Sequence, residues 1–211
     1  LEDKVYTEQT QETSIIHLDK NENLKGLSFL DQLYQAILKK KVLEITYQSF
    51  SARAPNVFSF HPFILKEYNN RWFLVGKKAD ASGVMTLALD RLLSVEEDLT
   101  TPYLEEVFDG DRYYKNTIGV TVFGDDHIQT VVLKIDRKNA PYVRTKPFHA
   151  SQQILERLED GSVIFQLELN LNLELERLLL GFGASIEVLK PRQLRRRMRW
   201  HFKRAMEVYA S

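Results

Sequence analysis

The chain contains no cysteine among its 211 residues, which excludes disulfide frameworks, thiolate zinc sites and cysteine nucleophiles. It has no excess charge of either sign, because 29 Lys and Arg residues balance 29 Asp and Glu residues. Attraction to nucleic acid must therefore come from a local patch. No apolar run approaches the roughly 18 residues of a membrane helix, and the N-terminus lacks a signal-peptide pattern. We expect a cytoplasmic protein with no membrane contact.

Signatures of catalysis and of metal binding are also missing from the sequence. The five histidines show no spacing of four residues that would place two metal ligands on one helix face. There is no Gly-x-x-x-x-Gly-Lys loop, no dinucleotide fingerprint and no Gly-x-Ser-x-Gly elbow. We therefore expect neither an enzyme nor a bound metal or cofactor.

The first half of the chain is rich in short runs of aromatic and branched residues. Three such runs, at residues 60–65, 71–76 and 87–92, are separated by turn-forming pairs, which predicts consecutive antiparallel hairpins. Ser28 is a candidate N-cap for a preceding helix, and residues 42–50 alternate as a half-buried strand does. Five short strands behind a helix suit a small SH3-like or Sm-like β-barrel.

The second half follows an acidic, irregular stretch at residues 96–116, which we interpret as a linker. The elements predicted beyond it are a strand at 129–135, a short helix at 138–143 interrupted near Pro141, strands at 154–158 and 163–169, a helix at 171–182, a strand at 185–189 and a final helix at 192–209. This order is that of a ferredoxin-like α+β domain with one additional helix. The predicted fold class is therefore α+β.

The segment Trp72-Phe73-Leu74, followed by Leu89-Asp90-Arg91-Leu92, resembles the WYL domain, with Phe73 in place of the family's tyrosine. Residues 183–191, before the final helix, resemble the C-terminal extension domain that commonly follows WYL. The resemblance implies a WYL barrel at 26–98, a linker at 99–116 and a ferredoxin-like extension at 117–211. Residues 1–25 are polar and begin without methionine, and we interpret them as a linker or a remnant of a longer protein.

Arg91 is the first candidate for function, because strand alternation across residues 87–92 would place it on the same side as Leu87 and Leu89. Two alternatives remain: a structural salt bridge with Asp90 or Glu44, or a binding group for phosphate or carboxylate. The resemblance favours the second alternative, since the Asp-Arg element lies near the family's ligand pocket. The candidate ligand-binding residues are Tyr47, His61, Arg71, Phe73, Lys77 and Arg91.

The final helix combines a strongly basic side with an apolar stripe. The stripe consists of Leu194, Met198, Phe202, Ala205, Met206 and Tyr209, and should anchor the helix on the sheet. The basic side is either solvated and paired with Glu174 and Glu176, or it contacts nucleic-acid phosphate or an acidic surface of a second subunit. The candidate contact residues are Arg192, Arg195, Arg196, Arg199 and Lys203.

The resemblance implies the effector-sensing and oligomerising portion of a bacterial transcriptional regulator. A nucleotide or a single-stranded nucleic acid would be the effector, and DNA would be bound by an N-terminal helix-turn-helix domain missing from this chain. The expected assembly is a homo-oligomer, most simply a dimer. The alternative is a protein-interaction module that takes no small ligand.

Overall fold

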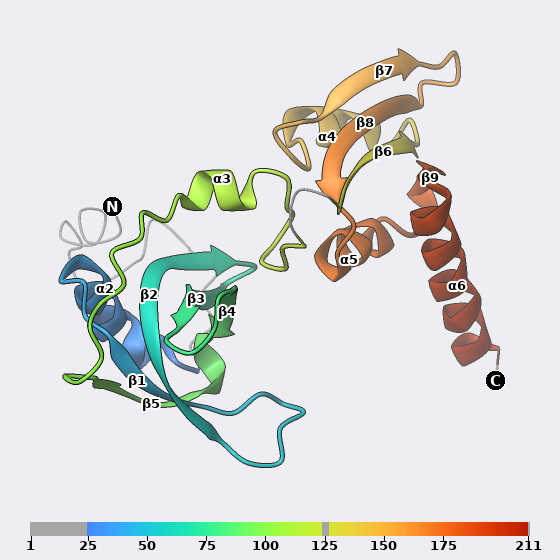
Figure 1. Cartoon of the computed structure of the whole chain (residues 1–211). Coiled ribbons are helices and arrows are strands. Elements are labelled where there is room, and N and C mark those ends of the chain that lie inside the picture. Colours follow the sequence, from blue (N-terminus) through green and yellow to red (C-terminus); the bar gives the residue numbers. More distant parts are fainter. Residues whose placement is uncertain (1–24, 124–126, 211) are drawn as a thin grey trace, which may run out of the picture.

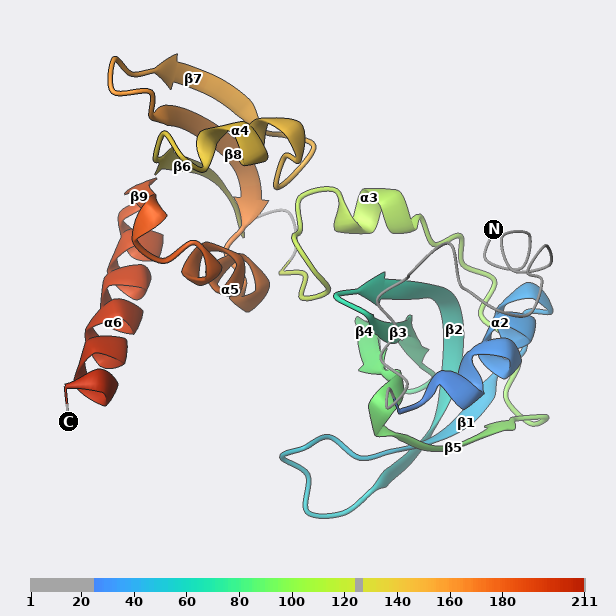
Figure 2. The ribbon, with the colours of Figure 1, turned by 180° about the vertical axis from the view of Figure 1, so that it is seen from behind.

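The computed structural model describes residues 25–123 and 127–210, which form two antiparallel sheets, each with its own hydrophobic core. Figures 1 and 2 show the two sheets side by side, with the connecting segment and helix α3 between them. The mixture of helices with two separate sheets confirms the predicted α+β class. Within the described ranges, no helix has both the length and the apolar content of a membrane span.

The first sheet has five antiparallel strands behind a helix, as predicted. Its strands follow one another as β4-β3-β2-β1-β5. The elements are η1 (Leu27–Phe29), α2 (Leu30–Leu38), β1 (Leu43–Tyr47), β2 (Asn56–Tyr68), β3 (Arg71–Lys78), β4 (Val84–Ala88), η2 (Leu89–Arg91) and β5 (Leu92–Glu97). Strand β2 is long enough to pair with β1 through its first part and with β3 through the remainder. Alternation along β1 buries Leu43 and Ile45 against Leu33 and Ala36 of α2.

The predicted N-cap at Ser28 is wrong. Helix α2 begins at Leu30, and the preceding residues, Ser28 included, form the 3-10 turn η1. The cause lies at Gly26, whose φ is +87°. A Cβ there would lie 2.2 Å from the carbonyl oxygen of Leu89. This close backbone contact sets where the chain enters the helix, and nothing in the local sequence indicates it.

The run at residues 87–92 is not one strand, which corrects the prediction made for Arg91. Strand β4 ends at Ala88, and residues Leu89–Arg91 form the 3-10 helix η2 before β5 begins. Strand alternation therefore stops before Arg91. Leu89 is buried in the barrel core, whereas Arg91 turns to another surface.

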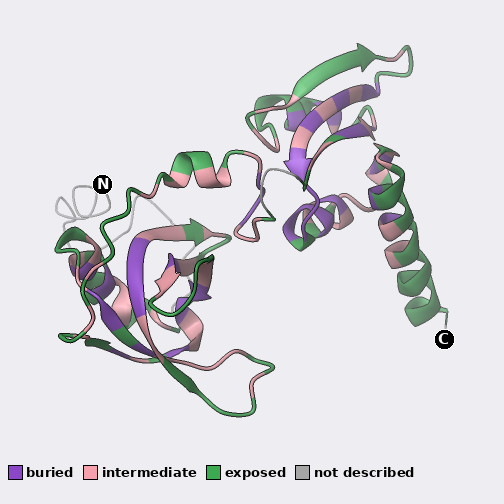
Figure 3. Ribbon diagram, viewed as in Figure 1, coloured by how far each residue is buried: buried purple, intermediate pink, exposed green. Residues whose placement is uncertain are grey.

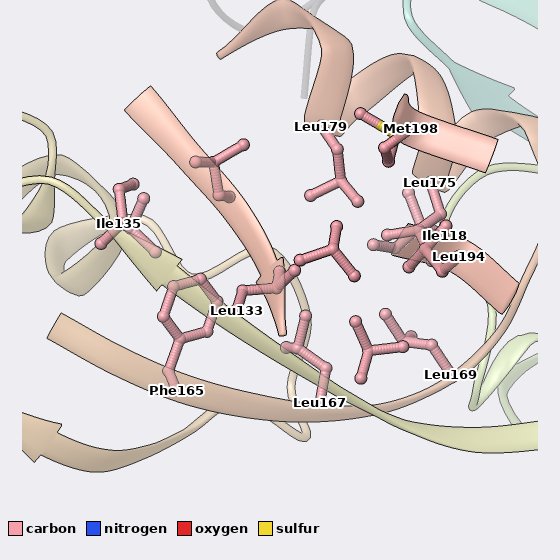
Figure 4. Packing of buried hydrophobic residues seen from close by; sticks show 14 of the residues in the cluster. Ile118, Leu133, Ile135, Phe165, Leu167, Leu169, Leu175, Leu179, Leu194 and Met198 are labelled. Atoms are coloured by element: carbon pink, nitrogen blue, oxygen red, sulfur yellow. The ribbon is translucent and has the colours of Figure 1, made fainter. Parts of the chain in front are cut away.

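The second sheet has the order β7-β8-β6-β9, all antiparallel, as a ferredoxin-like domain requires. Its elements are β6 (Ile128–Ile135), α4 (Ala140–Thr145), β7 (Gln153–Arg157), β8 (Val163–Asn170), α5 (Leu173–Gly181), η4 (Gly183–Ser185), β9 (Ile186–Lys190) and α6 (Arg192–Tyr209). Figure 4 shows the core, in which Leu133 and Phe165 from the sheet lie near Leu179 and Leu194 from the helices. Pro141 does not interrupt α4; it occupies the first turn, where a missing N–H costs nothing.

The segment predicted as a linker packs against the first sheet while it crosses to the second. Phe108 stacks on Phe63 of β2 with 5.2 Å between ring centroids, and the Tyr103 hydroxyl donates to the Pro62 carbonyl at 3.1 Å. A short helix, α3 (Gly110–Tyr114), begins where the Asp109 side chain accepts from the Arg112 amide. The connection is therefore held in place along much of its length.

Helix α6 is anchored only through its first half. Leu194 and Met198 are buried in the second core and Phe202 packs against it. Further along the predicted apolar stripe, Met206 is 74% exposed and Tyr209 is 87% exposed. Figure 3 shows the far half of α6 coloured as exposed. The predicted anchoring of the stripe is thus found for Leu194, Met198 and Phe202, but it does not extend to Met206 and Tyr209.

Candidate functional site

Arg91 lies on η2 with its guanidinium 4.3 Å above the ring of Phe50, a cation–π contact. Its Nε is 3.8 Å from Oδ1 of Asp90, which is an ion pair but too long for a hydrogen bond. Both of these atoms are buried and have no hydrogen-bond partner among the described residues. The side chain as a whole is 25% exposed. The predicted pairing with Asp90 is therefore present, but it leaves the guanidinium incompletely satisfied.

Arg71, at the start of β3, shares the same carboxylate. Its Nη2 lies 3.6 Å from Oδ2 of Asp90, so one acid serves two guanidiniums. The pair of arginines keeps a net positive charge after Asp90 is counted. A planar, permanently charged group of this kind is suited to phosphate or carboxylate.

A pocket of about 410 Å³ brings together three of the six predicted ligand-binding residues, namely Arg71, Phe73 and Arg91. Pockets of this size hold small organic ligands. The remaining lining comes from β4, α3, the connecting segment and α5, and consists of Val84, Thr86, Ala88, Tyr113, Val120, Thr121, Val122, Glu174 and Arg177. The pocket therefore lies between the first sheet and α5, with aromatic, cationic and acidic groups on its walls.

Helix α5 supplies two charged residues that sequence reasoning missed as pocket residues, Glu174 and Arg177. Glu174 is 91% buried, and its Oε1 accepts from the Thr121 hydroxyl at 2.8 Å. Gly119, with φ +85°, lies so close that a Cβ there would meet the Glu174 side chain at 2.4 Å. These contacts join distant parts of the chain, so no local pattern could have predicted them.

Asn172 fixes the wall formed by the connecting segment. Its side-chain oxygen accepts from the Leu175 amide at 2.9 Å and caps α5. Its side-chain nitrogen donates to the carbonyls of Ile118 and Thr121, at 2.8 and 2.9 Å. One buried side chain thus binds the start of α5 to the segment that lines the pocket.

His61 and Lys77 do not reach this pocket, which corrects their placement in one site with Arg91. The connecting segment covers both of them. The Leu104 amide donates to Nδ1 of His61 at 3.3 Å, and Glu106 forms an ion pair with Lys77. Burial lowers the pKa of His61 below its ordinary value, which favours the neutral ring as a structural acceptor. His61 is therefore a hydrogen-bonded structural histidine in this fold.

Tyr47 and Trp72 pack partly buried against the barrel core. Tyr47 pairs with Leu92 of β5, the residue that follows Arg91. It does not line the pocket. Trp72 is thus a residue of the barrel core's edge and does not line the pocket either.

A larger hollow of about 950 Å³ lies along β2 and α3. Its charged lining combines Lys66 and Lys115 with Glu67, Asp109 and Asp111. No residue predicted for ligand binding lines it, and its acids outnumber its lysines. It is therefore a poorer place for an anion than the pocket beside Arg91.

The basic residues of α6 fall into two groups. Arg195 is engaged at 2.7 Å with Glu187 and with the Val188 carbonyl, and Arg197 lies 3.0 Å from Glu176. The second group is exposed and forms no ion pair within 4 Å in the described part of the chain; it consists of Arg192, Arg196, Arg199 and Lys203. The predicted pairing of this helix with Glu176 is thus found, whereas Glu174 faces the pocket instead.

Comparison with known proteins gives two family matches. The WYL domain matches residues 28–97, and the WCX domain matches residues 127–206. No curated protein matches the chain.

Several solved structures are similar to the chain, among them the following two. Proteasome accessory factor B/C (PafBC) of Arthrobacter aurescens is 20% identical, with a TM-score of 0.35, over 87% of this chain and 27% of that one. A CRISPR Cas-related protein is 13% identical, with a TM-score of 0.49, over 85% of this chain and 50% of that one. The chain thus spans about a quarter and a half of these two proteins. With the two matched segments coinciding with the two sheets, the chain belongs to the WYL-domain proteins and carries a WYL domain followed by a WCX domain.

Proposed function

We propose that this chain is the effector-sensing and oligomerising portion of a bacterial transcriptional regulator, and that its effector is a nucleotide or a single-stranded nucleic acid. The observation that carries the proposal is the pocket in which Arg71, Arg91 and Arg177 surround a space beside Phe73. The WYL and WCX assignment supports the regulatory role.

The chemistry of the pocket suits a phosphate joined to a base. Three guanidiniums outnumber the two nearby acids, Asp90 and Glu174. Phe73 and Tyr113 provide aromatic surface, on which nucleobases stack with little regard to sequence. An effector that touched β3, η2 and α5 together would favour one arrangement of the two domains, because it contacts both. A DNA-binding domain outside this chain would then respond to that arrangement.

Fluorescence anisotropy with labelled single-stranded oligonucleotides, and competition by cyclic nucleotides, tests the proposal. Arg91→Ala should weaken binding about 10- to 100-fold, as expected for loss of charge-assisted hydrogen bonds of about 1.5–3 kcal/mol. Arg177→Ala should weaken binding too, since the pocket needs both domains. Arg144→Ala is the matched control, because this exposed arginine of α4 lies outside the pocket. Absence of binding, or equal loss in the control, would contradict the proposal.

A second candidate function, self-association without a small ligand, is favoured by the exposed apolar side chains of α6. Trp200 is 58% exposed, Met206 74% and Tyr209 87%. Sedimentation of the chain should show an oligomer that a Met206→Asp, Tyr209→Ser variant dissociates. A monomeric wild-type chain would remove this candidate.

A further inference from the structure

Helix α6 carries a continuous basic stripe, defined here as Arg192, Arg196, Arg199 and Lys203. At 100° per residue these four positions lie on the opposite side of the helix from Leu194 and Met198, which are buried. The stripe spans 11 residue steps, or about 16 Å at 1.5 Å per step. It therefore presents a line of cations to solvent along most of the helix.

The basic stripe is set apart from the other cations of the helix by its lack of partners. Arg195, Arg197 and Arg204 pair with Glu187, Glu176 and Glu207, respectively. In residues 25–123 and 127–210, no carboxylate lies within 4 Å of a stripe cation. The neighbouring acids are thus already used, and four positive charges remain uncompensated.

The position of these charges is also unfavourable for the helix itself. Arg192 and Arg196 lie in the first turns, where the helix dipole disfavours cations by a few tenths of a kcal/mol each. No acidic residue occupies the first turn of α6 to offset them. A bound polyanion would remove this unfavourable interaction.

We infer that the basic stripe binds the phosphate backbone of nucleic acid, as a contact separate from the effector pocket. Lysines and arginines clustered along one helix are the electrostatic footprint of such a contact. Protein–protein interfaces, in contrast, are depleted of charged residues at their centres. All four stripe positions are cationic, and the exposed Trp200 lies beside them at helical spacing, so the surface offers phosphate contacts next to an aromatic ring that can stack on a base.

The test measures anisotropy of the whole chain with a 20-base-pair duplex and with a 20-nucleotide single strand, at several salt concentrations. The stripe variant is Arg196→Gln, Arg199→Gln, Lys203→Gln. The matched control removes three exposed cations around α4, through Lys138→Gln, Arg144→Gln, Lys146→Gln. Both variants change the net charge equally, so a difference between them reports the location of the charges.

The stripe variant should bind at least 10-fold more weakly than wild type at low salt, and the control should stay within about threefold. The slope of log affinity against log salt should become shallower by about 2.7 for the duplex or by about 2.1 for the single strand, if each cation contacts one phosphate. The polymer bound more tightly identifies the form of nucleic acid. Circular dichroism should show both variants folded, since all six positions are exposed.

Equal weakening in both variants would overturn the inference, and so would unchanged binding in the stripe variant. A change in sedimenting mass without a change in nucleic-acid affinity would assign the stripe to a second copy of the chain and also overturn it. Arg91→Ala should leave duplex binding by the stripe intact, which separates this contact from the proposed effector site.

Discussion

Among the described residues, Glu176 and Asp90 each contact two basic side chains, and they do so differently. Glu176, in α5, lies 3.0 Å from both Arg197 and His201 of α6, and its side chain is only 4% exposed. Asp90, in η2, stands 3.6 and 3.8 Å from Arg71 and Arg91 and is 14% exposed. The first acid holds a helix in place. The second lies farther from its arginines, and neither of its two contacts is short enough for a hydrogen bond.

Removing the charge of Glu176 should cause the largest effect, because it is the more deeply buried acid. Breaking a buried ion pair costs about 3–5 kcal/mol, but Arg197 is 35% exposed, so we expect Glu176→Gln to lower the free energy of unfolding by about 2 kcal/mol. Urea denaturation followed by circular dichroism measures it. Glu187→Gln is the control, since its pair with Arg195 is exposed and should contribute less than about 1 kcal/mol. Equal losses in both variants would remove the distinction.

Asp90→Asn should affect ligand binding more than stability, which is the opposite of the result expected for Glu176→Gln. Without the competing carboxylate, Arg71 and Arg91 should bind a single-stranded oligonucleotide more tightly, by roughly 1 kcal/mol or about fivefold. The free energy of unfolding should change by less than about 1 kcal/mol, because neither contact of Asp90 is a hydrogen bond. Anisotropy measures the oligonucleotide affinity of this variant, and urea denaturation measures its free energy of unfolding. Weaker binding would show that Asp90 positions the arginines rather than competing with the ligand.

A third acid, Asp98, is stabilised by hydrogen bonds from neutral donors instead of by cations. Donors from Ser59, Thr101 and Thr100 hold the pKa of Asp98 well below its usual range. A lowered pKa stabilises the fold above the unfolded-state value near 4, and this contribution is lost as the pH falls through the folded-state value. Asp98→Asn should therefore lower the Tm slightly at pH 7 and flatten its decline below about pH 4. Thermal melts from pH 7 to pH 3 measure this; parallel curves for the two proteins would refute it.

Patterns that depend on one element were predictable from the sequence. The bounds of α6 and the succession of strands and helices along the second domain follow from helical and strand periodicity together with Gly161 and Gly183, and the structure has them. The buried face of β1 follows from alternation in the same way.

Features that depend on contacts between distant segments were not predictable. The corner at η2 requires Gly26 to pack on Leu89, and the pocket requires α5 to supply Glu174 and Arg177. Periodicity also marked an apolar stripe on α6, but it could not show that the sheet ends beneath its middle. The local sequence thus predicts most helices and strands, whereas tertiary contacts between distant segments determine which side chains meet.

Helix α5 is nine residues long and makes functional and structural contacts on two of its sides. Glu174 and Arg177 line the pocket. Glu176, which lies between them in sequence, contacts Arg197 and His201 of α6. Since Glu176 contacts both Arg197 and His201, α5 joins the wall of the pocket to the first half of α6 through side-chain contacts. The pocket and the basic stripe are therefore both connected to the same short helix, α5.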